Sequence, residues 1–170
     1  PSICIDQFLN PDFADQLAKS YPDYDDAMSL GREFKALNEN LKIQISDPTS
    51  FPDPVKELSA ALAEPDFIKR LSDMSGIKGL IWDPTFKGGG MHLTDSSGLL
   101  DVHVDFNLEK KLSLYRRINI LIYLNPVWED NWGGKVELWD KKVKRCAHSF
   151  SPIHNRCVIF NTGDYSFHGV

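Results

Sequence analysis

The chain has 170 residues, of which 42% are hydrophobic and 25% are charged, and its formal net charge is −5. This length and composition suit a single domain with a sizeable core, so we expect one domain over residues 1–170. The acidic balance argues against a nucleic-acid surface, which needs clustered Lys and Arg, and no apolar run approaches the roughly 18 residues of a membrane span.

The first 40 residues predict little regular structure beyond one strand and one helix. Residues 3–9 predict a short edge strand. Asn10 is a suitable N-cap, Pro11 fits the first helical turn, and Pro22 ends the apolar stripe of this helix. Residues 23–40 lack a clear pattern, and we expect the acidic run Asp23–Asp26 to be a solvated loop and not a metal-binding loop.

Two more helices and a series of short strands follow in the sequence. Pro54 and Pro65 each open a helix, and Gly76 is a plausible stop for the second one. The expected strands are residues 41–46, 77–82, 90–94, 117–124, 135–139, 143–146 and 156–160. This order predicts an α+β, mainly β fold: a double-stranded β-helix (jelly roll, cupin-like) with N-terminal helices buttressing one sheet.

The run from Leu100 to Asn107 places two good metal ligands two residues apart. In a strand, His103 and Asp105 would share one face, while Val102, Val104 and Phe106 would share the other. The pair alone is weak evidence, because a solvated strand would show the same pattern. His168, near the end of another β-like stretch, completes two imidazoles and one carboxylate, the facial triad of non-haem Fe(II) oxygenases.

The second half of the chain resembles the 2-oxoglutarate- and Fe(II)-dependent dioxygenases of the prolyl 4-hydroxylase-like group. Six motifs in this order carry the resemblance: Gly88-Gly-Gly-Met-His92, His103-Val-Asp105, Arg116-Arg-Ile-Asn-Ile-Leu-Ile-Tyr-Leu-Asn-Pro126, Gly133-Gly-Lys-Val-Glu-Leu138, Asn155-Arg-Cys-Val-Ile-Phe160 and Phe167-His-Gly169. It implies Fe(II) bound by His103, Asp105 and His168. It also implies 2-oxoglutarate and dioxygen as co-substrates, with succinate and CO2 as products.

The resemblance also implies a set of residues that contact the co-substrate. Tyr123 is expected to bind the distal carboxylate of 2-oxoglutarate. Leu121 and Val136 are expected to wall it, and Asn119 lies on the same inward row of its strand. Members of this group usually carry an Arg or Lys about ten residues beyond the distal His, so we expect the chain as given to lack its C-terminal strands. Arg117 is an alternative partner on the inward face.

Two other functions fit the same residues. One is a non-redox enzyme that uses Zn(II) in this two-His, one-carboxylate site. The other is a non-catalytic module that binds a small molecule on the same scaffold. The resemblance itself is compatible with a peptidyl or a small-molecule substrate, and the sequence does not distinguish them.

The basic run, the cysteines and the other histidines of the chain carry no further prediction of a binding site. The basic run Lys141–Arg145 is interpreted as a solvated strand end. Cys4, Cys146 and Cys157 are odd in number and lack metal-ligand spacing, which indicates reduced thiols and a cytoplasmic protein. His92, His148 and His154 fit none of the three metal positions.

Overall fold

The computed structural model describes residues 1–110 and 112–170, which form two compact units. The first unit comprises residues 1–18 and 101–170, and the second comprises residues 19–100. The helices are α1 Pro11–Ser20, α2 Tyr24–Leu30, α3 Asp53–Ala63 and α4 Pro65–Ser75, with short 3-10 turns at Pro48–Ser50 and Asp130–Trp132. The strands are β1 Ser2–Ile5, β2 Arg32–Ala36, β3 Glu39–Ile45, β4 Met91–Leu100, β5 Leu108–Glu109, β6 Leu114–Tyr115, β7 Ile118–Tyr123, β8 Val136–Trp139, β9 Cys146–Phe150, β10 Arg156–Asn161 and β11 His168–Gly169.

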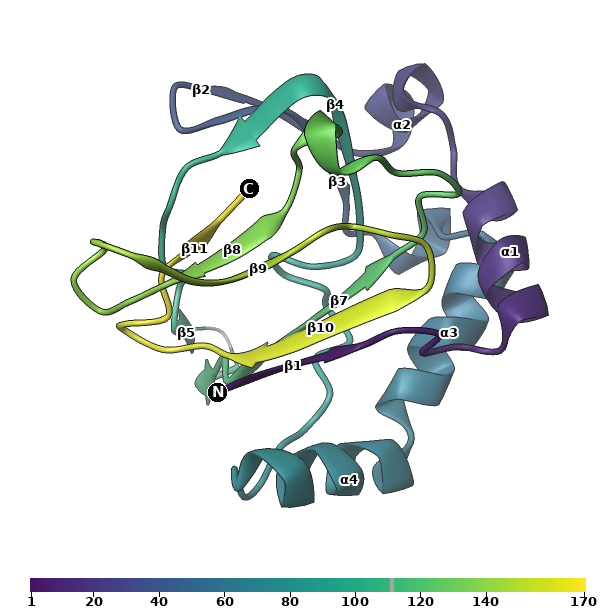
Figure 1. Cartoon of the computed structure of the whole chain (residues 1–170). Coiled ribbons are helices and arrows are strands. Elements are labelled where there is room, and N and C mark those ends of the chain that lie inside the picture. Colours follow the sequence, from purple (N-terminus) through teal and green to yellow (C-terminus); the bar gives the residue numbers. More distant parts are fainter. Residues whose placement is uncertain (111) are drawn as a thin grey trace. The chain divides into compact units, whose positions relative to one another are not determined.

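The first unit contains two antiparallel three-stranded sheets, with strand orders β1-β10-β7 and β11-β8-β9 (Figure 1). Alternation along β10 directs Val158 and Phe160 to one face, where they meet Val136 of β8 in a buried cluster. The partly buried side chains packed against this cluster come from both sheets: Cys4, Leu121, Tyr123, Leu138 and Phe150. The core of this unit therefore lies between its two three-stranded sheets.

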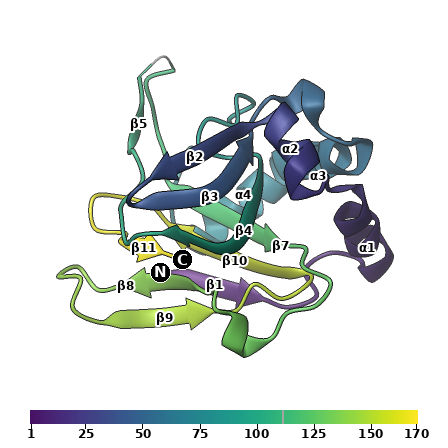
Figure 2. The ribbon, with the colours of Figure 1, turned by 90° about the horizontal axis from the view of Figure 1, so that it is seen from above.

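The second unit is built on the antiparallel sheet β2-β3-β4 (Figure 2). Ile43 and Ile45 of β3 and Met91 of β4 are buried in it. Gly90, which precedes β4, has a φ of +98°. A Cβ there would collide with the carbonyl oxygen of Ile45, so only glycine fits where the backbone approaches β3 this closely.

Several predicted elements are confirmed and others are wrong. The helices opening at Pro11, Pro54 and Pro65 are present, and Gly76 ends α4 in the left-handed conformation. Asp23–Asp26 is not a loop, because Asp23 caps α2 and the next residues begin that helix; the rest of residues 23–40 forms most of α2, all of β2 and the start of β3. Residues 77–82 are not a strand, and the strand expected at 143–146 begins only at Cys146.

The run 100–107 is also not a regular strand. Its only ladder position outside β4 is a single bridge between His103 and His168 within the described residues. The two residues exchange backbone hydrogen bonds, each 2.9 Å from nitrogen to oxygen. His103 and Asp105 therefore lie on an irregular segment that a single β-bridge holds in place.

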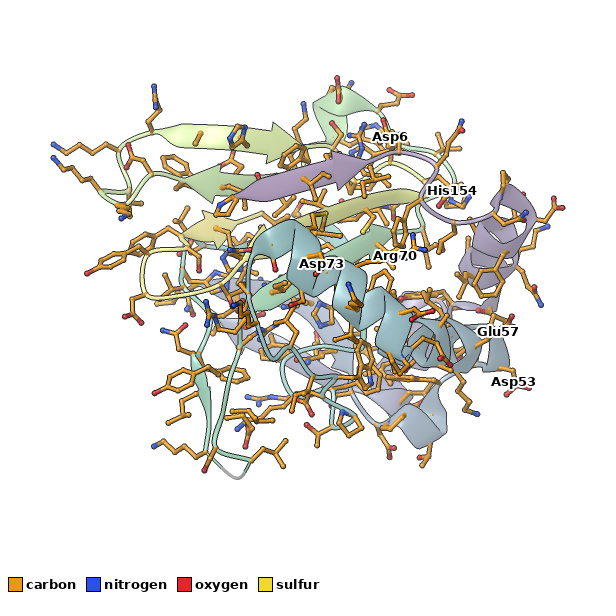
Figure 3. All side chains as sticks on the ribbon, turned by 90° about the horizontal axis from the view of Figure 1, so that it is seen from below. Asp6, Asp53, Glu57, Arg70, Asp73 and His154 are labelled. Atoms are coloured by element: carbon orange, nitrogen blue, oxygen red, sulfur yellow. The ribbon has the colours of Figure 1, made fainter. Side chains whose placement is uncertain are left out.

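Asn155 fixes the N-terminal segment of the first unit. Its side-chain amide donates to the carbonyl of Leu9 and accepts from the Leu9 amide, both at 2.8 Å. The residue is 4% exposed and has a φ of +57°, a conformation that Asn tolerates better than most residues. Nearby, Arg156 binds both carboxylate oxygens of Asp6, and His154 contacts Asp15; Figure 3 labels Asp6 and His154.

We expect Asn155→Ala to lower the free energy of unfolding by about 2–4 kcal/mol. The change removes two hydrogen bonds from a buried site and leaves alanine in the left-handed region, which it tolerates less well than asparagine. Denaturant titration measures the loss. Asn155→Gly is the control, because glycine removes the side-chain amide but adopts the left-handed φ without strain. An alanine variant as stable as the parent would contradict this role.

Candidate metal centre

Three side chains that the sequence predicted as metal ligands come together in the first unit. Across the part of the chain that the structure describes, one group of potential ligands forms: His103, Asp105 and His168, whose ligand atoms all lie within 4.8 Å of one another. The Nε2 atom of His103 is 3.7 Å from Oδ1 of Asp105, and that of His168 is 3.6 Å from Oδ2. The two imidazole centroids are 4.4 Å apart.

Backbone carbonyls define which imidazole nitrogen faces the centre. Nδ1 of His103 is 2.8 Å from the carbonyl of Asp101, and Nδ1 of His168 is 2.8 Å from the carbonyl of Ser166. A carbonyl only accepts, so each Nδ1 carries a proton, and the Nε2 atom of each ring is the nitrogen that faces the carboxylate. A bound cation could be coordinated by the two Nε2 atoms and a carboxylate oxygen of Asp105, which converge on one point. The three residues therefore fit a metal ion.

The protonation of the site also favours metal binding. Burial would raise the pKa of Asp105, but His103, Arg116 and His168 together hold that pKa well below its usual range. Burial lowers the pKa of His168, so its ring is neutral at neutral pH. A carboxylate and neutral imidazoles are the forms that coordinate a metal.

Two further residues hold Asp105 in place. Nδ2 of Asn119 on β7 donates to Oδ2 of Asp105 at 2.7 Å, and Nε of Arg116 donates to Oδ1 of Asn119 at 3.0 Å. Arg116 also lies over the ring of Phe106, 5.2 Å from its centroid. The contact of Arg116 with this site was not predicted, because only the irregular path of residues 101–107 brings the two together.

The other predicted site residues lie on the inward face of the same unit. Leu121 and Tyr123 follow Asn119 along β7 at alternate positions, and both pack against the cluster that contains Val136. Burial raises the pKa of the Tyr123 phenol, so this hydroxyl remains a hydrogen-bond donor. Arg117, the alternative basic partner for 2-oxoglutarate, is exposed. Arg156 of β10 lies opposite Tyr123 in the antiparallel register.

The remaining histidines do not join the centre. His154 contacts Asp15 at 3.0 Å, and His148 stacks on Phe150 with centroids 6.2 Å apart. No described helix is long and apolar enough to cross a membrane.

Comparisons with known proteins agree with this geometry. The family model of the 2OG-Fe(II) oxygenase superfamily matches residues 82–170, just over half of the chain. A stretch of 59 residues is 36% identical to the prolyl 3-hydroxylase OGFOD1 of Mus musculus; it is 32% of this chain and 11% of that protein. The chain thus spans a small part of that relative's length.

Solved structures show a similar fold. A Pseudomonas putida prolyl-4-hydroxylase gives a TM-score of 0.68 at 18% identity, over 99% of this chain and 82% of that one. A second similar structure is a Trichoplax adhaerens prolyl hydroxylase in complex with a hypoxia inducible factor oxygen degradation domain peptide fragment. Its TM-score is 0.65 at 17% identity, over 99% of this chain and 76% of that one.

Proposed function

We propose that this chain, which belongs to the 2OG-Fe(II) oxygenase superfamily, is a hydroxylase of unactivated C–H bonds that converts 2-oxoglutarate and dioxygen to succinate and CO2. The observation that carries the proposal is the convergence of His103, Asp105 and His168, with both Nδ1 atoms committed to backbone carbonyls. Bound Fe(II) would supply oxygen activation, and two imidazoles with one carboxylate leave open positions for co-substrate and oxygen.

The chain's own residues hold and orient the reactants. Asn119 keeps one oxygen of Asp105 fixed by hydrogen bonding, so the carboxylate has a defined orientation toward the centre. Tyr123 is the proposed donor to the distal carboxylate of 2-oxoglutarate. Leu121 and Val136 are the proposed apolar wall, and Asn119 the proposed polar neighbour, of that co-substrate.

We also propose a fold type, a substrate class and a cellular location for this chain. The two three-stranded sheets of the first unit, with a core between them, support a double-stranded β-helix, or jelly roll. The similar prolyl hydroxylase solved with a peptide favours a peptidyl substrate, with a prolyl side chain as the first candidate. The free thiols of Cys4, Cys146 and Cys157 support a cytoplasmic location.

Succinate formation tests the activity. We expect succinate from 2-oxoglutarate only when Fe(II) and dioxygen are both present, together with a product one oxygen atom heavier when a prolyl peptide is the substrate. Activity that persists with Zn(II) and without dioxygen would instead identify a non-redox zinc enzyme. Ligand binding without any succinate from iron-loaded protein would identify a binding module.

Tyr123→Phe tests the proposed co-substrate contact. We expect the dissociation constant for 2-oxoglutarate to rise roughly 10-fold or more, because a hydrogen bond to a charged group is lost from a desolvated site. Equilibrium titration measures it, and Tyr115→Phe is the control because Tyr115 is 69% exposed. Unchanged affinity in Tyr123→Phe would remove this residue from the proposed binding site.

A further inference from the structure

The turn between β8 and β9 concentrates positive charge on an acidic chain. Lys141, Lys142, Lys144 and Arg145 fall within five consecutive positions, all exposed, whereas the whole chain has a net charge of −5. Several other lysines pair with carboxylates, such as Lys42 with Glu39. Among the described residues, the structure shows no ion pair between these four cations and a carboxylate.

The backbone of this turn is held in a defined shape. One carboxylate oxygen of Asp140 accepts from the amides of Lys142 and Lys144, at 2.9 and 3.1 Å. The Asp140 amide donates to the carbonyl of Arg145 at 3.0 Å, and Val143 adopts a φ of +54°. The single acidic residue of the turn therefore organises its backbone and does not cancel its side-chain charges.

The turn extends from the strand that pairs with a metal ligand. Leu138 of β8 is in register with His168, and the Trp139 amide donates to the carbonyl of Phe167 at 2.8 Å. With a rise of about 3.3 Å per residue, Lys141, two residues beyond the end of β8, lies at most about 10 Å along the strand direction from that position. Figures 1 and 2 both show the turn and the loop before β11 at the same end of β8.

An exposed aromatic side chain joins the turn to the loop that carries the distal ligand. Nζ of Lys141 lies 5.3 Å from the ring centroid of Tyr165, which is 63% exposed. In the same loop, Asp164 accepts a hydrogen bond from Asn107, two residues after Asp105. The turn thus contacts the loop before His168, and that loop is hydrogen-bonded to the segment that follows Asp105.

We propose that this cationic turn, residues 140–145 together with Tyr165, docks an acidic segment of the peptide or protein substrate. The inference rests on the proposed function and adds the charge of the substrate. A separation of about 10 Å corresponds to about three residues of extended peptide, so the acidic segment lies a few residues from the hydroxylated one. A nucleic acid fits less well, because phosphate binding needs a broader cationic stripe than one turn.

Direct binding tests the proposal without turnover. The probe is a fluorescein-labelled hexaglutamate peptide, measured by anisotropy at low and physiological salt, with hexaglutamine and a uridine octamer for comparison. The test variant is K141Q/K142Q/K144Q/R145Q. The matched control is K19Q/K56Q/K69Q/K78Q, which removes the same charge from exposed positions elsewhere.

We expect hexaglutamate to bind the parent more tightly than hexaglutamine does, with affinity that falls as salt rises. The turn variant should bind it about tenfold more weakly, and the control less than twofold. Equal losses in both variants, or none in the turn variant, would overturn the proposal. Tighter binding of the uridine octamer through the same residues would overturn it in favour of nucleic acid.

The outcome is separable from the proposed activity. Binding of hexaglutamate needs neither Fe(II) nor 2-oxoglutarate, so failure to form succinate would not alter it. Conversely, the turn variant should retain the parent's 2-oxoglutarate consumption in the absence of any peptide. Loss of that basal consumption would show that the turn supports the fold or the metal centre and does not dock substrate.

Discussion

Replacing His168 by alanine is expected to abolish stoichiometric Fe(II) binding and succinate formation. Loss of a residue that only supports a metal ligand weakens binding roughly 10- to 100-fold, and loss of a ligand itself should exceed that range. His168 supplies one of the converging Nε2 atoms and lies 3.6 Å from Asp105. Asp105→Ala should have the same effect, because it leaves two imidazoles without the negative charge that favours a bound cation.

Anaerobic titration with Fe(II) followed by metal analysis measures this effect. His154→Ala is the matched control, since His154 contacts Asp15 and does not belong to the centre. Circular dichroism verifies that each variant is folded. Parent-like iron affinity in folded His168→Ala protein would show that the metal is held elsewhere.

Phe160→Ala is expected to cost about 3–5 kcal/mol of unfolding free energy. Phe160 is 3% exposed and packs with Val136 and Val158 between the two sheets of the first unit, so truncation leaves a cavity that the core fills only partly. Its ring also meets that of His168 edge-on, with centroids 5.0 Å apart. The same change should therefore loosen the orientation of a metal ligand.

Denaturant unfolding measures the stability loss. Val127→Ala is the control for truncation at an exposed site, since Val127 is 68% exposed, and it should change stability by less than about 0.5 kcal/mol. Phe160→Leu retains much of the volume and should cost less than alanine. An alanine variant as stable as Val127→Ala would mean that Phe160 does not support the core.

The candidate metal ligands could be predicted because several motifs in a specific order accompany them, although the His103-Val-Asp105 spacing alone is weak evidence. His103, Asp105 and His168 were chosen by residue type and order, and the structure brings them together. The expected strand through residues 100–107 was wrong, since the single bridge between His103 and His168 orients the pair. Arg116 was missed for the same reason: no periodic pattern places its guanidinium beside Asp105.

Local backbone chemistry explains the elements that were wrongly predicted. Asp23 caps α2 by accepting from the Asp26 amide, but the acidic composition of that segment was interpreted as a loop. Residues 77–82 are mostly apolar, yet Gly76 and Gly79 both have left-handed φ values, and the segment remains irregular. The strand after the cationic turn starts late because Asp140 binds the amides of Lys142 and Lys144.

One measurement tests the central claim most directly: anaerobic addition of 2-oxoglutarate to the iron-loaded protein, followed by visible absorption. If His103, Asp105 and His168 hold Fe(II) with open positions, chelation of the 2-oxo acid should produce a weak charge-transfer band that is absent from His168→Ala. A folded, iron-loaded protein that gives no band with saturating 2-oxoglutarate would contradict the proposed oxygenase.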